Sequence, residues 1–599
     1  MSLPHLTPTT LQQYATPQSY SRGESYFRGG AVISLTQRQQ TLQGEVEGNE
    51  VMPYRITIDF DGGGVTHAEC TCLYSFSGWC KHIVATLLAC IHEPEIIEQR
   101  PTLAQLLDPL TLVQTQGLVQ HLVAERPDLI ELIDLHASQL FQPKENVKRP
   151  ASLSKRRTSV DPVPFKRRAR EILRSAVRDW ENGRDDDDIG IDLGELIADA
   201  LAFAEQGDAA NALVVLQGVT EGCVNNWDEV ENFCGLTPLD VGVDFDAAWA
   251  EALLSADLSE DEVIGWQEEL EGWQDLLGSF EMALAALRQG WDYAPLVRVL
   301  QGDISELGAW EGEAPDWADE FSQIRLKILA RQERYEEYLH LAEGEGQTQQ
   351  YLAMLGQLGR VDQAMQVAQT DLTTLSEAQA LAEVLRSQNQ LPQALEIALQ
   401  GLRLDDSNPY IAFEFATWAS DLAEGMGDTS AALASRIIAF KARPSFQDYQ
   451  RIEGLAADSW PEIKESLLQY LRASQSWGME QAQIDIFLDE GLLEDAIAVA
   501  SKLSSYYSSL ILRVMDRVVA SDHLAHNQWV IDNARPRAES IMDEGKAKYY
   551  ADAVKWLKQI KAAYHVLGKA ADWSCYRQAL LSQHGRKYKL MGLMKENKL

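Results

Sequence analysis

Apolar residues alternate with polar ones, or cluster with β-branched ones, in four short segments between residues 31 and 72. Glycine-containing turns separate them, a pattern typical of antiparallel hairpin strands. The segments are 31–37, 41–48, 50–60 and 65–72, and the turns lie at 48–49 and 61–64. The N-terminal part of the chain is therefore predicted to be β-rich.

Beyond residue 178 the apolar residues recur at spacings of three and four, which predicts amphipathic helices. Clear examples are 193–206, 380–388, 391–404 and 549–567. The expected fold class is α+β: a small N-terminal β-hairpin and helix module, followed by a mostly α-helical, tetratricopeptide-like solenoid.

A short sequence pattern, called the phrase below, recurs in the helical part. It consists of a small or polar residue, four residues, an alanine, three residues and a second alanine. The best copies are Gly359/Ala364/Ala368, Asn389/Ala394/Ala398 and Gly491/Ala496/Ala500, and looser ones are Gly207/Ala212/Leu216, Glu333/Tyr338/Ala342 and Gly427/Ala432/Arg436. Small residues at the start of a second helix let it pack closely on the first, which favours stacked helical hairpins. The intervals are less regular than those of tetratricopeptide repeats.

Charge divides the chain. Its 599 residues carry 52 basic and 90 acidic side chains, a formal net charge of −38. The net charge is −8 over 1–143, +9 over 144–178 and −39 over 179–599. We predict a β-rich module at 1–143 with its core at 20–95 and trailing helices, a basic linker and helix at 144–178, an acidic, tryptophan-rich helical domain at 179–330, and a helical repeat domain at 331–599.

No apolar stretch approaches the roughly 20 residues that a membrane-spanning helix needs. The N-terminus also lacks the basic start and apolar block of a secretory signal, so we expect a cytoplasmic protein that does not contact membranes. Seven cysteines are present, and three of them lie within eleven residues beside a histidine. That grouping indicates metal chemistry in a reducing compartment.

The candidate chemistry lies at residues 70–82, where Cys70-x-Cys72 is followed after seven residues by Cys80-x-His82. Residues i and i+2 of a strand face the same side, so Cys70 and Cys72 can present two thiolates together. The apolar pattern after Cys80 places Cys80 and His82 at the start of a helix. Four such ligands are enough for one closed, structural Zn²⁺ site, and Lys81 is placed to offset its net charge of −1.

The sequence leaves two alternatives to zinc: ordinary buried cysteines beside a surface histidine, and a disulfide within the Cys-x-Cys pair. Two dipeptide-spaced ligand pairs rarely coincide, and a disulfide would leave the second pair unexplained, so zinc is favoured. The remaining thiols and nearby histidines are expected to be strand, core or otherwise structural residues: Cys90, His92, His67, Cys223, Cys234 and Cys575.

The motif resembles the SWIM zinc finger, in which C-x-C, a variable gap and C-x-H lie on a strand-strand-helix frame. Flanking residues resemble the N-terminal module of bacterial SWIM zinc finger proteins: Arg22-Gly23, Tyr26, Gly44, Gly48 and Tyr54. The acidic, tryptophan-rich middle and the closing segment 548–590 resemble their long helical part. The resemblance implies binding to DNA or to proteins.

The charge pattern gives nucleic-acid binding partial support. The module is acidic, which disfavours phosphate contact, but the adjoining basic block supplies cations. The candidate contacts to DNA or RNA are Lys81, Lys155, Arg156, Arg157, Lys166, Arg167, Arg168 and Arg170. Two alternatives stay open: the block is a solvated linker, or it docks on the acidic helical part, for example on Asp185–Asp188, and is masked.

The acidic helical part would repel nucleic acid, so its expected partners are proteins, with a helicase-type ATPase as one hypothesis. Seven tryptophans could line a peptide groove, but their spacing favours the helical core: Trp227, Trp249, Trp266, Trp273, Trp291, Trp310 and Trp317. The acidic run at 185 is no calcium loop, because Ile189 and Leu196 occupy two ligand places.

The motifs of phosphate loops, serine nucleophile elbows, zinc-protease helices and dinucleotide sites are missing, so we do not expect an enzyme. The predicted function is that of a zinc-binding adaptor. It would contact nucleic acid through the finger and basic linker, and recruit a protein through the helical repeats. The alternative is a pure protein-interaction scaffold that binds no nucleic acid, and a metal-dependent nuclease is less favoured.

Overall fold

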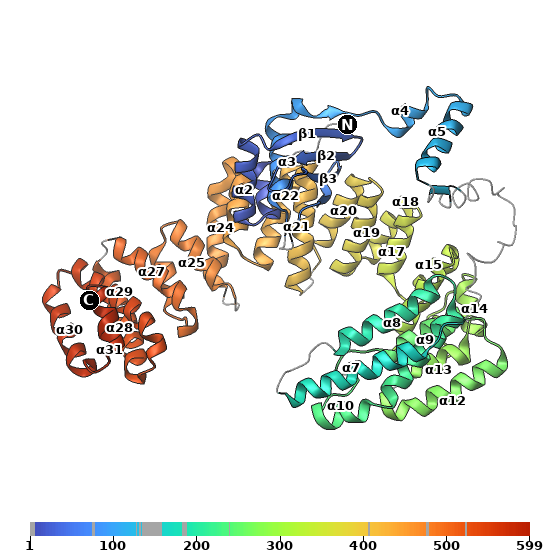
Figure 1. The fold of residues 1–599 in the computed structure, drawn as a ribbon. Coiled ribbons are helices and arrows are strands. Elements are labelled where there is room, and N and C mark those ends of the chain that lie inside the picture. The colour runs from blue at the N-terminus through green and yellow to red at the C-terminus, as the bar shows by residue number, and fades with distance from the viewer. Residues whose placement is uncertain are drawn as a thin grey trace. The chain divides into compact units, whose positions relative to one another are not determined.

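The computed structural model describes residues 6–74, 78–126, 129–130, 133, 159–182, 189–238, 240–278, 280–404, 408–474, 478–521 and 524–599. Contacts divide the chain into two compact units. Unit 1 joins residues 1–102 to 391–599, and unit 2 comprises 103–390; both can be followed by colour in Figure 1. The domain boundary predicted at 143/144 lies outside the described residues, and the other predicted boundaries stay predictions.

The N-terminal part of unit 1 contains a five-stranded sheet in the order β4-β3-β2-β1-β5. Strands β1 to β4 form an antiparallel meander, and β5 joins β1 in parallel. The elements of this N-terminal module are α1 (Pro8–Tyr14), α2 (Pro17–Arg28), β1 (Val32–Arg38), β2 (Thr41–Val46), β3 (Tyr54–Asp61), β4 (Gly64–Cys70), α3 (Lys81–His92) and β5 (Glu98–Gln99).

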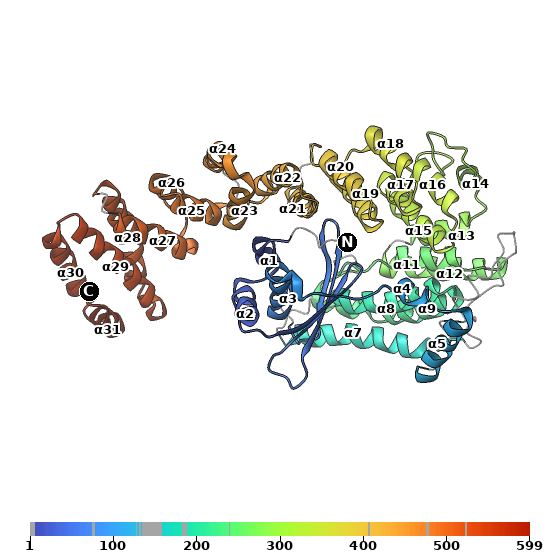
Figure 2. The ribbon, with the colours of Figure 1, turned by 90° about the horizontal axis from the view of Figure 1, so that it is seen from above.

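The core of the module explains its sequence pattern. On β3 every second residue is buried, from Tyr54 to Phe60, and these side chains share one hydrophobic core with α3. Helix α3 is buried along most of its length because α2 packs on it as well as the sheet. The predicted β-hairpin and helix module is confirmed, and Figure 2 shows its strands and helices from above.

The rest of unit 1 is helical. Consecutive helices pack as hairpins, most extensively α21 with α22 and α28 with α29. The helices are α20 (Leu391–Gly401), α21 (Pro409–Gly425), α22 (Thr429–Ala442), α23 (Phe446–Ala456), α24 (Trp460–Ala473), α25 (Glu480–Asp489), α26 (Leu493–Ala500), α27 (Ser508–Ala520), α28 (Leu524–Glu544), α29 (Tyr550–Val566), α30 (Ala570–His584) and α31 (Tyr588–Glu596).

The described part of unit 2 is helical throughout. Its main core contains Trp227, Trp249 and Trp310, and the other four predicted tryptophans pack against that core. The helices are α4 (Leu103–Leu107), α5 (Leu112–Glu125), α7 (Val163–Glu181), α8 (Ile189–Glu205), α9 (Ala209–Val224), α10 (Trp227–Cys234), α11 (Phe245–Ser255), α12 (Glu260–Leu277), α13 (Glu281–Gln289), α14 (Ala294–Leu300), α15 (Ala318–Arg331), α16 (Tyr335–Gly344), α17 (Thr348–Gln357), α18 (Val361–Asp371) and α19 (Leu375–Ser387).

The recurring phrase of the sequence marks tight turns between consecutive helices. Each of its six opening residues has a left-handed φ: Gly207 +81°, Glu333 +58°, Gly359 +71°, Asn389 +59°, Gly427 +81° and Gly491 +72°. The alanines that follow are fully or almost fully buried. The fold class α+β is confirmed, while a tetratricopeptide-like character stays a prediction. Over the described residues, none of the helices is long and apolar enough to cross a membrane.

Within unit 1, the N-terminal module packs on α21 and α23. Glu424 and Arg451 form a buried ion pair, and the Thr10 hydroxyl of α1 lies within hydrogen-bond distance of both, at 3.3 and 3.1 Å. The Tyr14 hydroxyl donates to Asp421 Oδ2 over 2.5 Å. The contacts of Thr10 and Tyr14 join residues more than 400 positions apart.

The turn between β3 and β4 is also part of this seam. Gly63 lies so close to the end of α21 that a Cβ on Gly425 would overlap its carbonyl oxygen, and a Cβ on Gly63 would overlap Leu422. The glycine run at 62–64 therefore serves the approach of the hairpin to the helices as well as the turn itself.

Candidate metal centre

The four predicted ligands come from three adjacent places in the module. Strand β4 ends at Cys70, and Cys72 lies in the bend that follows. The backbone N–H of Thr71 donates to the carbonyl of Arg55 over 3.0 Å, which keeps this bend beside β3 although the strand has ended. Cys80 is the N-cap of α3 and His82 lies in its first turn.

Their ligand atoms all lie within 4.8 Å of one another. His82 Nδ1 is 3.6 Å from Cys70 Sγ and 3.9 Å from Cys80 Sγ. A tetrahedral Zn²⁺ with Zn–S of about 2.3 Å and Zn–N of about 2.0–2.1 Å has edges of roughly 3.5–3.8 Å between ligand atoms. The residues therefore fit one zinc ion, bound through Nδ1 of the imidazole.

Aromatic packing fixes the ring of His82. Tyr54 stacks on it with centroids 4.1 Å apart and planes at 21°, and Tyr26 meets it edge-on at 5.5 Å. Gly48 is required here, because a Cβ would overlap the Tyr54 ring. His82 Nε2 is buried and has no hydrogen-bond partner among the described residues. The ring is thus oriented by packing, with Nδ1 facing the thiols.

The environment of the thiols prepares one of them for metal binding. A hydrogen bond from Cys70 lowers the pKa of the Cys80 thiol to about 4, helped by His82 and by the Ile83 N–H at the start of α3. The same hydrogen bond, with burial, raises the pKa of Cys70, and burial raises that of Cys72. Cys80 is therefore the thiol most readily deprotonated, and the charge of a bound cation would favour deprotonation of the other two.

Lys81 is held beside the site. Its Nζ donates to the Tyr26 hydroxyl over 2.6 Å and lies 4.3 Å from the centre of that ring. This position suits the predicted offset of the negative charge of a zinc–thiolate site. Its role in nucleic-acid contact stays a prediction.

The remaining cysteines and histidines of the module lie outside the cluster. Cys90 is buried in the core, and His92 stacks on Phe27. His67 is largely exposed on β4 near Glu69. In unit 2, Cys223 is buried and Cys234 half-buried, whereas Cys575 of α30 is exposed.

Apart from Lys81, the predicted basic contacts divide into two groups. Lys155, Arg156 and Arg157 lie outside the described residues. The other four lie on α7, where Lys166 pairs with Glu221 at 2.5 Å and Arg168 with Glu195 at 3.6 Å, so these two cations are directed at neighbouring acidic helices. Arg167 lies 3.9 Å from Glu171 of its own helix, and Arg170 is exposed.

Sequence reasoning missed two members of the basic helix. Arg174 and Arg178 continue the spacing of Arg170 and are exposed on the same helix. The signal was available, since both lie within the basic block 144–178, four and eight residues beyond Arg170. The opposite face of α7 is buried through Ala169 and Leu173 among others.

A strand, a bend and a helix N-terminus that bring together three cysteines and a histidine define a small zinc-finger module. Residues 54–91 match the model of the SWIM zinc finger family, so the chain contains a SWIM zinc finger. Over 117 residues the chain is 31% identical to "Zinc finger SWIM domain-containing protein 8 homolog" of Drosophila melanogaster. The match covers 19% of this chain and 6% of that protein. Similarity to the bacterial proteins stays a prediction.

Proposed function

We propose that this protein is a non-catalytic zinc-binding adaptor. In this proposal the zinc finger keeps the N-terminal module folded on its helical support, α7 contacts the phosphates of a nucleic acid, and the helical surface recruits a protein. A zinc ion held by three thiolates and an imidazole has no open position for water or substrate, which supports a structural role.

The observation that carries nucleic-acid contact is the arginine row of α7, defined as Arg170, Arg174 and Arg178. Successive members are four residues apart, a rise of about 6 Å along one side of a helix. All three are exposed, and none forms an ion pair with a carboxylate among the described residues. The buried opposite face holds the helix in place, so the three cations are presented on a fixed support.

Fluorescence anisotropy of the zinc-loaded protein with labelled duplex and single-stranded DNA, titrated across salt, tests this proposal. We expect an affinity that falls steeply as salt rises, because phosphate contacts release counterions. Changing the arginine row to alanine should weaken binding by roughly tenfold or more at low salt and reduce the salt slope by about three.

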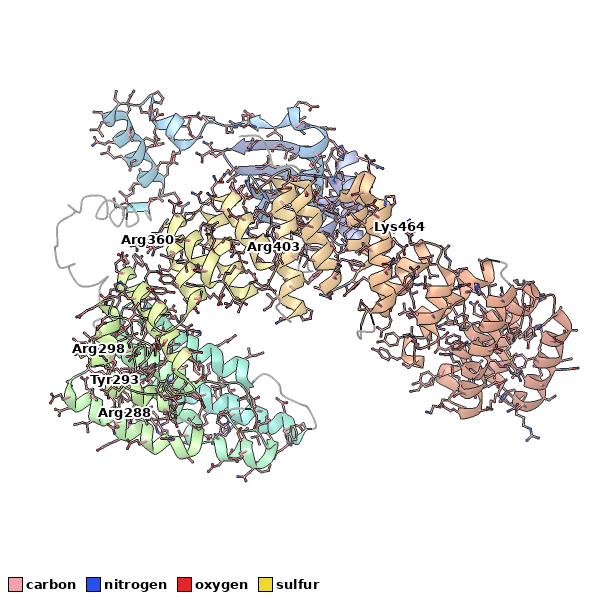
Figure 3. All side chains as sticks on the ribbon, turned by 180° about the vertical axis from the view of Figure 1, so that it is seen from behind. Arg288, Tyr293, Arg298, Arg360, Arg403 and Lys464 are labelled. Atoms are coloured by element: carbon pink, nitrogen blue, oxygen red, sulfur yellow. The ribbon has the colours of Figure 1, made fainter. Side chains whose placement is uncertain are left out.

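A matched control removes the same charge elsewhere. Arg288, Arg298 and Arg403 are exposed on other parts of the chain, as Figure 3 shows, and their triple alanine variant should bind like the wild type. Equal loss in both variants would reflect net charge alone and contradict the proposal. So would a lack of binding at low salt.

The scaffold alternative rests on a different observation. Lys166 and Arg168 pair with Glu221 and Glu195, so part of the basic block docks on acidic helices, as the masking hypothesis expected. A protein that binds no DNA at any salt concentration would favour this alternative.

A further inference from the structure

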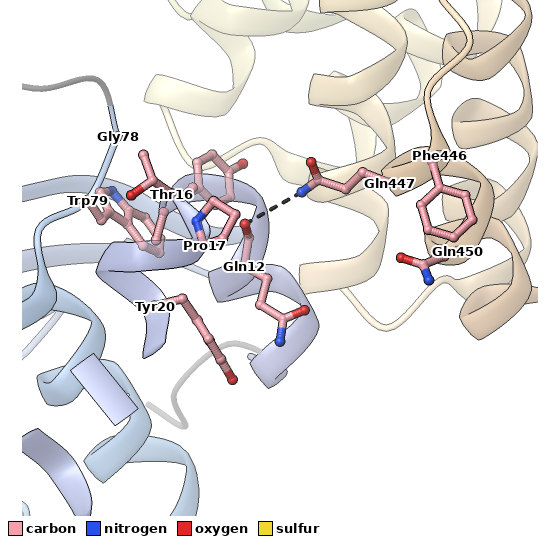
Figure 4. A pocket seen from close by; sticks show the side chains of 11 residues that line it. Gln12, Thr16, Pro17, Tyr20, Gly78, Trp79, Phe446, Gln447 and Gln450 are labelled. Atoms are coloured by element: carbon pink, nitrogen blue, oxygen red, sulfur yellow. Dashed lines mark hydrogen bonds between the residues drawn. The ribbon is translucent and has the colours of Figure 1, made fainter. Parts of the chain in front are cut away.

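A cavity of about 760 Å³ lies in the seam of unit 1, between the zinc-finger loop, α1, α2 and α23. Its walls come from residues far apart in sequence: Tyr14, Tyr20 and Trp79 on the module, and Phe446, Gln447 and Gln450 on α23 (Figure 4). Gln447 Nε2 donates to the Gln12 carbonyl over 3.5 Å, which joins the two sides at one edge.

The lining is aromatic and uncharged. The rings of Tyr14 and Trp79 stack with centroids 4.6 Å apart and planes at 23°, and Tyr20, Phe446 and Pro17 add further apolar surface. Among the residues that the structure describes, no charged side chain lines this cavity, although about a quarter of the residues in the chain are charged. The cavity therefore offers no ion-pair partner to phosphates or other charged groups.

The polar side chains of the cavity are amides and hydroxyls, the hydroxyls coming from Tyr14, Thr16 and Tyr20. Gln12 and Gln450 are exposed at its rim, and each has an amide that can donate to or accept from a ligand. Flat rings beside amide donors suit a polyproline II segment, because that conformation leaves its backbone carbonyls unpaired and presents proline rings to aromatic faces.

We propose that this cavity, the seam pocket, binds a neutral, proline-rich peptide segment in the polyproline II conformation. The proposal rests on the adaptor function, for which it names the chemistry of a protein partner. A second cavity of about 510 Å³ shares Tyr14 and Gln447 with the first, but charged side chains line it: Glu414, Asp421, Arg436, Arg443 and Asp448. The neutral segment is therefore assigned to the seam pocket alone.

The zinc-finger loop forms one wall of the seam pocket. Trp79 directly precedes the ligand Cys80, and its backbone N–H donates to the Tyr14 carbonyl over 2.5 Å. Gly78 has φ +83°, and a Cβ there would crowd the same carbonyl at 2.6 Å. The finger thus positions the two stacked rings that a proline would contact.

The test uses full-length, zinc-loaded protein and fluorescein-labelled decaproline, followed by anisotropy at low and high salt. We expect saturable binding that changes little with salt, because the seam pocket offers no charge. A labelled glycine-serine peptide of equal length should not bind. Phe446→Ala and Gln450→Ala should each weaken decaproline binding, the first by roughly tenfold or more.

Tyr588→Ala is the matched control, because Tyr588 is 86% exposed and lies on α31, outside the seam pocket. Gln450 is exposed, so its variant should fold even if Phe446→Ala does not. Absence of saturable decaproline binding would overturn the proposal, as would wild-type affinity in folded Gln450→Ala and Phe446→Ala.

A ten-nucleotide oligothymidine tests the competing possibility that the seam pocket binds a nucleic acid. Its displacement of decaproline from the wild type would assign the stacked rings to nucleobases and overturn the peptide proposal. The triple variant of the arginine row should bind decaproline normally. Loss of DNA binding in that variant and loss of peptide binding in the seam variants are therefore separate results, so the two proposals can fail independently.

Discussion

At the scale of single residues, the zinc site depends on neighbours that do not touch the metal. His82 offers Nδ1 to the thiols because Tyr54 and Tyr26 hold its ring, and Gly48 leaves room for Tyr54. The pattern of cysteines and histidine predicted the ligands. It could not predict which imidazole nitrogen faces them, because that choice depends on rings contributed by α2 and β3.

Asp246 of α11 has a pKa that burial raises from 3.8 to about 6, although it accepts the backbone N–H groups of Met282 and Ala283 at 3.0 and 2.7 Å. A raised carboxyl pKa means that the folded state prefers the protonated form. Its contribution to stability is therefore complete below about pH 4 and is lost as the pH rises through about 6.

We expect this loss to be about 1–2 kcal/mol after discounting for solvent screening at a partly exposed group. Asp246→Asn does not titrate, so the difference in unfolding free energy between wild type and variant should change by this amount between pH 4 and 7.5. Urea denaturation at both pH values measures it. An equal pH dependence in the two proteins would contradict the assignment.

At the scale of elements, the sequence predicted the turns between helices but not the seam, the contact of the N-terminal module with α21 and α23. A left-handed turn followed by two buried residues, at least one of them alanine, is a local rule, and all six copies of the phrase obey it, even those with Glu333 and Asn389 in the turn. The seam joins Thr10 to Glu424 and Gly63 to Gly425. A local sequence pattern cannot predict such contacts, because the residues that form them are far apart in the chain.

Gly425→Ala tests the close approach of the β3–β4 turn to α21. The added Cβ meets the backbone of Gly63, which cannot rotate away as a side chain could, so we expect docking of the module to weaken by about 1–3 kcal/mol. Hydrogen exchange should increase in α1 and in the turn, while zinc content stays at one per chain.

Gly454→Ala is the control, because Gly454 is exposed on α23 and a Cβ there meets no atom within 4 Å. Alanine also favours a helix over glycine by about 1 kcal/mol, so this variant should be as stable as the wild type or more stable. Unchanged exchange in Gly425→Ala would mean that the turn and α21 separate in solution.

At the scale of the whole molecule, the zinc finger is part of a larger interface in unit 1. A continuous path runs from the ligand Cys80 through the Trp79 backbone to Tyr14, and from the Tyr14 hydroxyl to Asp421. Asp421 in turn pairs with the buried Arg436 at 2.5 Å. The metal site and the helical support are thus connected by hydrogen bonds and a buried ion pair.

Removing zinc should therefore affect α1 as well as the finger. Without the metal, nothing bridges Cys70, Cys72 and Cys80, so the loop between β4 and α3 is no longer closed. Trp79 then loses its fixed position beside Tyr14. We expect chelation to increase hydrogen exchange in 64–92 and in α1, with little change in unit 2, where described Cys and His residues form no comparable cluster.

Cys72→Ser should reproduce this exchange pattern and lower the zinc content from about one per chain to near zero, since a hydroxyl is a poor replacement for a thiolate ligand. Cys575→Ser, which changes an exposed thiol on α30, should retain zinc and normal exchange. Increased exchange confined to 64–92, with α1 still protected, would show that the seam holds without the metal. In that case the contacts of Thr10 with the ion pair of Glu424 and Arg451, rather than the path through Trp79, would be the main support of docking.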